Sequence, residues 1–227
     1  MWAVMKKELK SYFYSPIGYV FIGLFLAIFS FIFYITTISQ GAVTYQYVFF
    51  YSVMYIVIFL IPLLTMRTFA EERKNGTEQI LMTAPRSAVA IVLGKFLAAL
   101  VVIAITELFT LIYFGIICYF KTPDIPTVLV TMFGFLITSM AYISLGMFIS
   151  SLTENQIIAA VSTIAIFVLA WLAPSISTKL TAISLIEKFY PFATGVFPIT
   201  ETIRLISITA MFVALTMVFI KRRKLVK

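Results

Sequence analysis

The amino-acid sequence predicts an all-α polytopic membrane protein with six transmembrane helices. The first observation is composition, because 62% of the 227 residues are hydrophobic and 11% are charged, whereas soluble domains carry about 25% charged residues. The second is a mean hydropathy of +1.08. The third is the stretch from Ser11 to Met66, which contains no Asp, Glu, Lys or Arg. Together they predict that most of the chain lies in a lipid bilayer.

Residues 1–15 are predicted to form an interfacial helix before the first span. Its apolar residues recur at helical spacing on one side: Trp2, Met5, Leu9, Tyr12 and Phe13. The other side is polar and mostly basic: Lys6, Lys7, Lys10 and Ser11. Such a helix lies in the membrane interface with its lysines toward anionic headgroups. A disordered basic leader is the alternative, and the aromatic spacing favours the helix.

The long uncharged stretch must fold into a hairpin. As one helix it would be about 84 Å long, against a hydrocarbon core of about 30 Å. Its polar segment 37–46 marks the turn, and further breaks follow at the charged segment 67–85, the proline-containing turn 121–126 and the polar link 152–156. Pro174 is expected to end the fifth span. The spans are therefore expected at 17–36, 47–65, 88–120, 127–151, 157–173 and 201–220.

Lys and Arg are distributed unequally between the two sides of this topology. Thirteen of the 17 lie in the segments 1–15, 67–95 and 221–227. The remaining four lie on the opposite side: Lys121, Lys179, Lys188 and Arg204. By the positive-inside rule the basic side faces the cytoplasm. We therefore expect a multi-pass protein of the cytoplasmic membrane, with both termini and the charged segment in the cytoplasm.

Residue content excludes several kinds of site. The chain has no His, a single Cys and a single Asp, which excludes imidazole metal sites, Ser-His-Asp triads and disulfides within the chain. Gly94-Lys95 resembles the end of a P-loop, but Val89 and Phe96 stand where that motif needs Gly and Ser or Thr. Lys95 is instead expected to snorkel to the headgroups. We expect no catalytic residue, no bound metal and no nucleic-acid partner.

The charged segment 67–85 carries equal numbers of both signs: Arg67, Arg73, Lys74, Glu71, Glu72 and Glu78. A lipid-binding segment would be strongly basic, whereas a balanced set suits a protein surface. Two small apolar patches flank Gly76, which predicts two short amphipathic helices with a joint at Gly76. Pro85 would end the second helix. A solvated loop that only anchors topology is the alternative, and composition does not separate the two interpretations.

Part of this segment resembles the signature of permeases of the type-2 (exporter) ABC-transporter family. The matching string is Glu71-Glu72-Arg73-x-x-Gly76-Thr77-Glu78-x-x-Leu81-x-x-x-Pro85. Residues 6–20 resemble the connecting helix of that family, residues 145–160 its turn between spans four and five, and residues 189–198 its outer segment before span six. The branch that the chain is most similar to comprises gliding-motility and copper-enzyme-maturation permeases.

The resemblance implies a permease subunit that moves substrate by alternating access, without being an enzyme itself. Such a subunit pairs with a second permease copy, as a homodimer, and rests on two ATPase subunits that bind ATP and Mg. The charged segment would be the coupling helix that docks on the ATPase. Its roles would be ionic contact by Glu71, Glu72 and Arg73, a joint at Gly76 and Thr77, and seating of the second helix by Leu81 and Pro85, with Glu78 in the same partner-binding set.

Glu107 lies near the middle of the third span, about 18 Å along the helix from Lys95. An ionisable group at that depth is costly and is a functional candidate. It suggests an alternative function, an ion-gradient-driven secondary transporter, although the repeats and several carboxylates expected of one are not found. A structural interpretation, in which Thr106, Thr110 or a neighbouring span satisfies the carboxyl or it stays protonated, is favoured for one isolated carboxylate.

Two further groups are predicted to be structural. Glu201 and Arg204 lie one helical turn apart at the outer end of the sixth span, which favours a local ion pair over a substrate site. Gly134, Thr138 and Ala141 place small residues on about one face of the fourth span. Small residues allow close helix approach in lipid, and packing within one subunit is favoured over a dimer contact.

Overall fold

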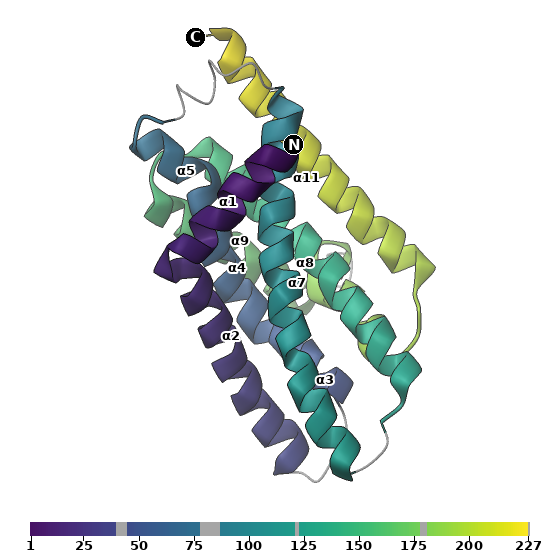
Figure 1. Ribbon diagram of the computed structural model, residues 1–227. Helices are drawn as coiled ribbons and strands as arrows, with labels where there is room; N and C mark the ends of the chain where they lie inside the picture. Colours follow the sequence, from purple (N-terminus) through teal and green to yellow (C-terminus); the bar gives the residue numbers. More distant parts are fainter. Residues whose placement is uncertain (40–44, 78–86, 121–122, 178–180, 227) are drawn as a thin grey trace.

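The computed structural model describes five segments of the chain, residues 1–39, 45–77, 87–120, 123–177 and 181–226. The described segments contain helices and no strand, and six of the helices are long and apolar enough to cross a membrane. This confirms the predicted all-α, six-span class. Both termini lie toward the same end of the bundle, as do α1 (Trp2–Tyr14) and α5 (Arg67–Lys74) (Figure 1).

The first two spans contain irregular helical segments. Span one consists of α2 (Pro16–Phe33) followed by the π-helical segment η1 (Tyr34–Ile38). Span two consists of α3 (Tyr45–Tyr51), the π-helical segment η2 (Ser52–Val57) and α4 (Ile58–Thr65). Pro16 stands in the first turn of α2, where its missing N–H costs nothing. The middle of the predicted hairpin turn, residues 40–44, lies outside the described residues.

The remaining spans are α7 (Ala88–Phe120), α8 (Ile125–Leu152), α9 (Gln156–Ile176) and α11 (Ile199–Val226). Asn155 caps α9, its side chain accepting a backbone N–H of the first turn at 2.9 Å. The prediction that Pro174 ends the fifth span is wrong, because α9 continues to Ile176. A proline near a helix end removes one N–H donor, and Ser177 still donates to the Ala173 carbonyl.

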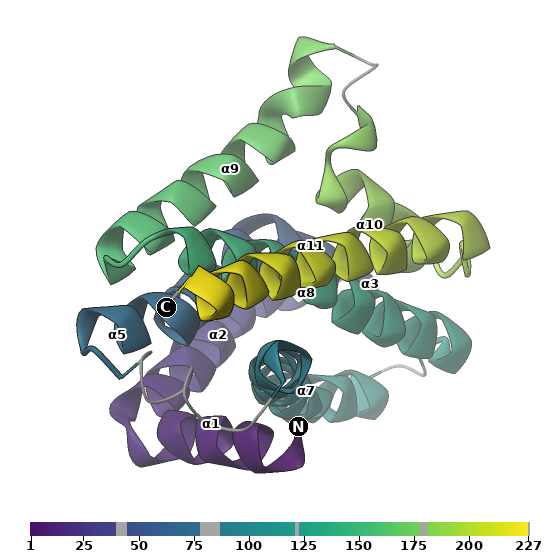
Figure 2. The same ribbon diagram turned by 90° about the horizontal axis from the view of Figure 1, so that it is seen from above.

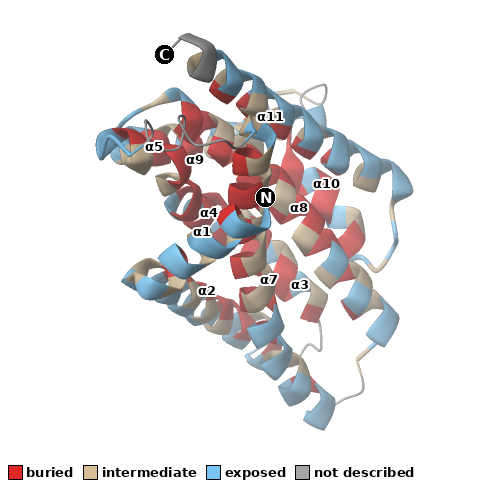
Figure 3. Cartoon of the chain, turned by 45° about the horizontal axis from the view of Figure 1, so that its top comes forward, coloured by how far each residue is buried: buried red, intermediate tan, exposed pale blue. Residues whose placement is uncertain are grey.

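Spans two and four form the centre of the bundle. In the most apolar 18-residue stretch of each span, 67% of the residues are buried in span two and 61% in span four, against 28% in α9 and in α11. Figure 3 shows the buried residues gathered on α4, α8 and the inner side of α7. Seen from above, α9 leans away from the other helices (Figure 2). Large apolar side chains on the outer faces of α2, α9 and α11 are exposed, as expected for contact with lipid.

The face of span four that carries small residues packs against other parts of the same chain. A Cβ placed on Gly134 would lie 2.4 Å from the Phe192 ring, which belongs to the short helix α10 (Leu185–Ala193). Thr131 donates a hydrogen bond to the Phe192 carbonyl at 3.0 Å, and Thr138 and Ala141 are fully buried. In the described part of the chain this face therefore serves packing inside one subunit, as predicted.

Candidate functional site

The first predicted helix of the charged segment is present as α5. It follows α4 after the single residue Met66 and ends before Asn75. Gly76 has a φ of 70°, and its N–H donates to the Arg73 carbonyl at 3.0 Å. Residues with a side chain adopt that conformation reluctantly, so glycine ends the helix here. The second predicted helix, with the site candidates Glu78, Leu81 and Pro85, lies outside the described residues.

A buried ionic cluster joins α5 to α1 and α7. The Lys95 Nζ lies 2.9 Å from Glu72 Oε1 and 3.1 Å from Glu8 Oε1. The Lys95 side chain is only 1% exposed, and its ammonium lies over the Phe69 ring. Lys7 approaches the same Glu72 oxygen at 3.4 Å. The prediction that Lys95 snorkels to the headgroups is wrong, because two carboxylates enclose its charge inside the bundle.

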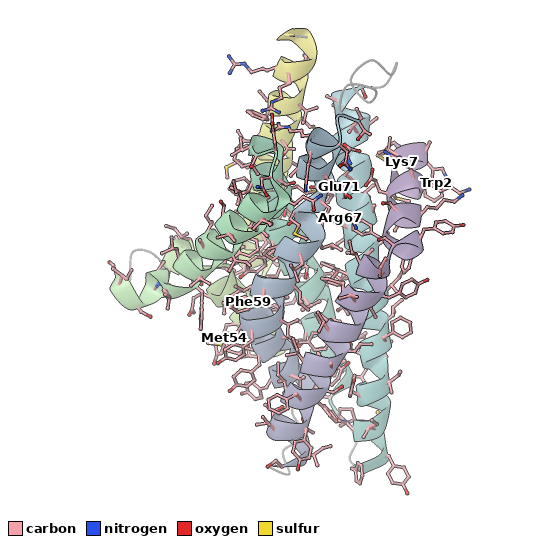
Figure 4. The ribbon with its side chains drawn as sticks, turned by 90° about the vertical axis from the view of Figure 1, so that its left-hand side faces the viewer. Trp2, Lys7, Met54, Phe59, Arg67 and Glu71 are labelled. Carbon is pink, nitrogen blue, oxygen red and sulfur yellow. The ribbon has the colours of Figure 1, made fainter. Side chains whose placement is uncertain are left out.

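Three other charged residues of α5 are also engaged within the chain. Arg67 donates from Nε and Nη2 to the two Glu71 oxygens at 2.6 and 2.7 Å, a bidentate pair one helical turn apart (Figure 4). The Arg73 guanidinium is buried, donates to the Ser151 carbonyl of α8 and lies 5.9 Å from the centre of the Phe219 ring of α11. The Arg73 contacts hold α5 against α8 and α11.

The start of α5 is capped by another helix. The first turn of a helix leaves backbone N–H groups without intrahelical partners. Ser150 of α8 satisfies two of them, because its Oγ accepts from the N–H of Phe69 at 3.3 Å and of Ala70 at 3.2 Å. The same hydroxyl donates to the Met66 carbonyl at 3.0 Å. The direction in which α5 leaves span two is therefore set by α8.

The predicted interfacial helix is present as α1, and it packs on the bundle rather than existing as a disordered leader. A Cβ on Gly94 would lie 2.8 Å from the Val4 Cβ, so α7 needs glycine where α1 crosses it. The buried Tyr12 hydroxyl donates to the Leu64 carbonyl at 3.2 Å, and burial raises the pKa of Tyr12 above its ordinary value. Trp2 points away from the bundle (Figure 4).

Sequence reasoning missed the partners Glu8, Lys95, Ser150 and Ser151. One signal was available, because Lys95 is a charged residue inside an apolar run and such a charge needs a partner. The serines gave none, since they are about 80 positions from α5. A set of residues around α5 is exposed, which we name the α1–α5 surface: Lys6, Lys7, Lys10, Lys74, Asn75, Gly76 and Thr77.

Glu107 is 2% exposed inside α7, and its Oε1 has no hydrogen-bond partner among the described residues. The neighbouring hydroxyls are used elsewhere. Thr106 donates to the Val102 carbonyl at 2.8 Å, and Thr110 donates to the backbone carbonyl of Glu107 at 2.6 Å. The interpretation in which these two threonines satisfy the carboxyl is therefore wrong, and the carboxyl stands apart from α5 and its ionic cluster.

Residues 35–220 match the sequence profile described as ABC-2 family transporter protein. The match begins in η1, includes Glu72, Lys95 and Ser150, and ends within α11. It leaves out α1, which supplies Glu8 to the ionic cluster. No curated protein matches the chain.

Proposed function

The chain belongs to the ABC-2 family of transporter proteins, and from that premise we propose that it is the permease subunit of an ATP-driven exporter whose ATP is hydrolysed by a separate subunit. The observation that carries the proposal is the attachment of α5. A loop that only anchored topology would have no need of contacts with three other helices. Here α5 is bonded to α1, α7 and α8 through residues far apart in the sequence.

In this proposal α5 is the coupling helix. A movement that the ATPase imposes on α5 would pass to α7 through Glu72 and Lys95, and to α8 through Ser150 and Arg73. Packed helices transmit motion as rigid bodies, so such contacts suit alternating access better than a loop would. Two permease copies, as a homodimer in the cytoplasmic membrane, would rest on two ATPases that hold ATP and Mg. The narrower assignment to the gliding-motility and copper-enzyme-maturation branch rests on the resemblance alone.

The contacts within the chain change the roles that the family resemblance implies for the signature residues. Glu72 and Arg73 are mostly buried, so we assign them to transmission within the permease. Glu71 keeps part of its side chain exposed, at 29%, while paired with Arg67. The α1–α5 surface, with Gly76 and Thr77 at its joint, would supply most of the contact with the ATPase. Its lysines suit an acidic groove on that partner.

Reversing the charge of Lys74 tests this contact. Because Lys74 is exposed and α5 keeps its other contacts, Lys74→Glu should leave the fold intact and weaken association with the ATPase about tenfold. The measurement is co-purification of a P-loop ATPase with the chain, followed by ATP hydrolysis and transport in vesicles. Glu187→Lys, a charge reversal at an exposed position of α10, is the control for association with the ATPase. Transport that needs no ATPase would contradict the proposed function.

The alternative, an ion-gradient-driven transporter, depends on Glu107. A carboxyl that carries a coupling ion cannot be replaced by an amide of the same shape without loss of transport. For an ATP-driven permease we expect Glu107→Gln to transport within about twofold of the unaltered protein, because the amide matches the carboxyl in size. The measurement is the transport rate in vesicles with ATP and with an ion gradient. Abolished transport in Glu107→Gln, with melting unchanged, would favour the alternative.

A further inference from the structure

A polar cavity of about 420 Å³ lies between α10 and the first turns of α11. Its lining is Thr181, Ala182, Glu187, Lys188, Glu201 and Arg204. The cavity is remote from α5, because Glu201 is about 27 Å along α11 from Phe219, the residue beside Arg73. Figure 2 shows α10 close to the N-terminal part of α11, on the opposite side of the picture from α5.

A buried ammonium forms one side of this cavity. Lys188 is 5% exposed, and its Nζ donates to the carbonyls of Ala182 and of Ser184, the latter at 3.1 Å. An ammonium carries three donors, and two of them have acceptors among the described residues, so the third can serve a group in the cavity. Burial lowers the pKa of Lys188, and the nearby Glu201 opposes that shift. An anionic group that reached Nζ would stabilise the charged form further.

A carboxylate with one unused oxygen forms the other side. Glu201 Oε1 accepts from Arg204 Nη1 at 2.6 Å, so the predicted local ion pair is confirmed. Glu201 Oε2 is buried and has no hydrogen-bond partner in the described part of the chain. A buried polar atom left without a partner is costly, and a bound donor would remove that cost. Arg204 is 60% exposed and offers further N–H groups beside it.

Among the described residues that line the cavity, the four charged side chains sum to zero, which favours neither a simple anion nor a simple cation. We propose that the cavity binds a zwitterion that carries a primary ammonium and an anionic group. The ammonium donates to Glu201 Oε2, and the anionic group accepts from Lys188 and Arg204. Two sources supply this chemistry, the headgroup of an ethanolamine phospholipid and a free amino acid. Three exposed isoleucines lie within two positions of lining residues in the sequence and would suit the acyl chains of a lipid: Ile183, Ile199 and Ile203.

Binding of defined lipids to the purified full chain tests the proposal. In detergent, we expect phosphatidylethanolamine to bind about tenfold more tightly than phosphatidylcholine, measured by native mass spectrometry. The reason is that a quaternary ammonium has no N–H for Glu201 Oε2. Phosphatidylglycerol, which lacks an ammonium, should also bind weakly. Phosphoethanolamine and glycine, added without lipid and measured by calorimetry, form the soluble arm, and their binding would identify a free zwitterion as the occupant.

Two substitutions locate the site. Glu201→Gln should abolish the preference for phosphatidylethanolamine over phosphatidylcholine. Lys188→Met should weaken binding of both of these lipids. Glu154→Gln, an exposed carboxylate in the turn between α8 and α9, is the matched control and should bind as the unaltered chain does. Equal binding of the three lipids by the unaltered chain, with no soluble zwitterion bound, would overturn the proposal even if a variant failed to fold. The result is independent of the ATPase and leaves the proposed function untouched.

Discussion

Glu72→Lys is expected to lower the free energy of unfolding by about 3–5 kcal/mol and to detach α5 from the bundle. The Lys95 ammonium would lose its 2.9 Å partner and face a like charge while only 1% exposed. Glu8 alone could not neutralise two buried cations. The measurement is thermal melting in detergent, together with limited proteolysis at Asn75 and Gly76, which should become faster. Glu154→Lys, the same change at an exposed position, should melt unchanged.

A double-mutant cycle measures the interaction between Lys95 and Glu72. Lys95→Met leaves two carboxylates side by side, and Glu72→Met leaves the ammonium with Glu8 alone, so each change should destabilise the chain. The double variant should lose less free energy of unfolding than the two single variants lose together, because neither charge is then left buried without the other. If Glu72→Lys melts as Glu154→Lys does, the cluster does not anchor α5.

The ionic cluster also changes how the proposed coupling role of the charged segment can be tested. From the sequence, reversing Glu71 and Glu72 together should uncouple ATP hydrolysis from transport while the permease stays in the membrane. The contacts of Glu72 mean that this double reversal would also disturb α1 and α7. Lost transport would then have two causes. Lys74→Glu separates them, because Lys74 is exposed and its backbone lies at the end of α5.

The spans and the end of α5 could be predicted because they depend on local properties. The length of an apolar run fixes whether it can cross a bilayer, and Gly76 ends α5 because glycine tolerates the positive φ that the turn needs. Pro174 was misjudged because a proline near a helix end removes only one donor. The rules for the length of a span and for glycine at a helix end need no knowledge of neighbouring helices.

The partners of α5 could not be predicted, because they depend on how helices cross. Lys95 meets Glu8 only because α1 folds back across α7, and the glycine that permits this, Gly94, resembled part of a P-loop in the sequence. Ser150 caps α5 only because α8 passes beneath it. A charged residue inside an apolar run indicates that a partner exists, but not which one.

Gly146→Ala is expected to lower the free energy of unfolding by about 1–3 kcal/mol and to reduce transport per ATP hydrolysed. A Cβ on Gly146 would lie 2.4 Å from Thr65 Oγ1. Thr65 is fully buried and its hydroxyl is bonded to the Ile61 carbonyl at 3.0 Å, so α4 and α8 would have to separate. Melting in detergent measures the first effect, and transport with the reconstituted ATPase measures the second.

The coupling defect follows from the position of Gly146, one helical turn from Ser150 along α8. A separation at Gly146 would pull the Ser150 hydroxyl from the N–H groups of α5, so the junction would loosen as well as the span. Gly115→Ala is the control, since nothing lies within 4 Å of the new Cβ and alanine favours a helix. Adding Thr65→Ala to Gly146→Ala removes the hydroxyl that the new Cβ would meet. The double variant should recover part of the lost stability and part of the lost transport per ATP hydrolysed. If melting falls while coupling stays normal, the contact stabilises span four without transmitting motion from α5.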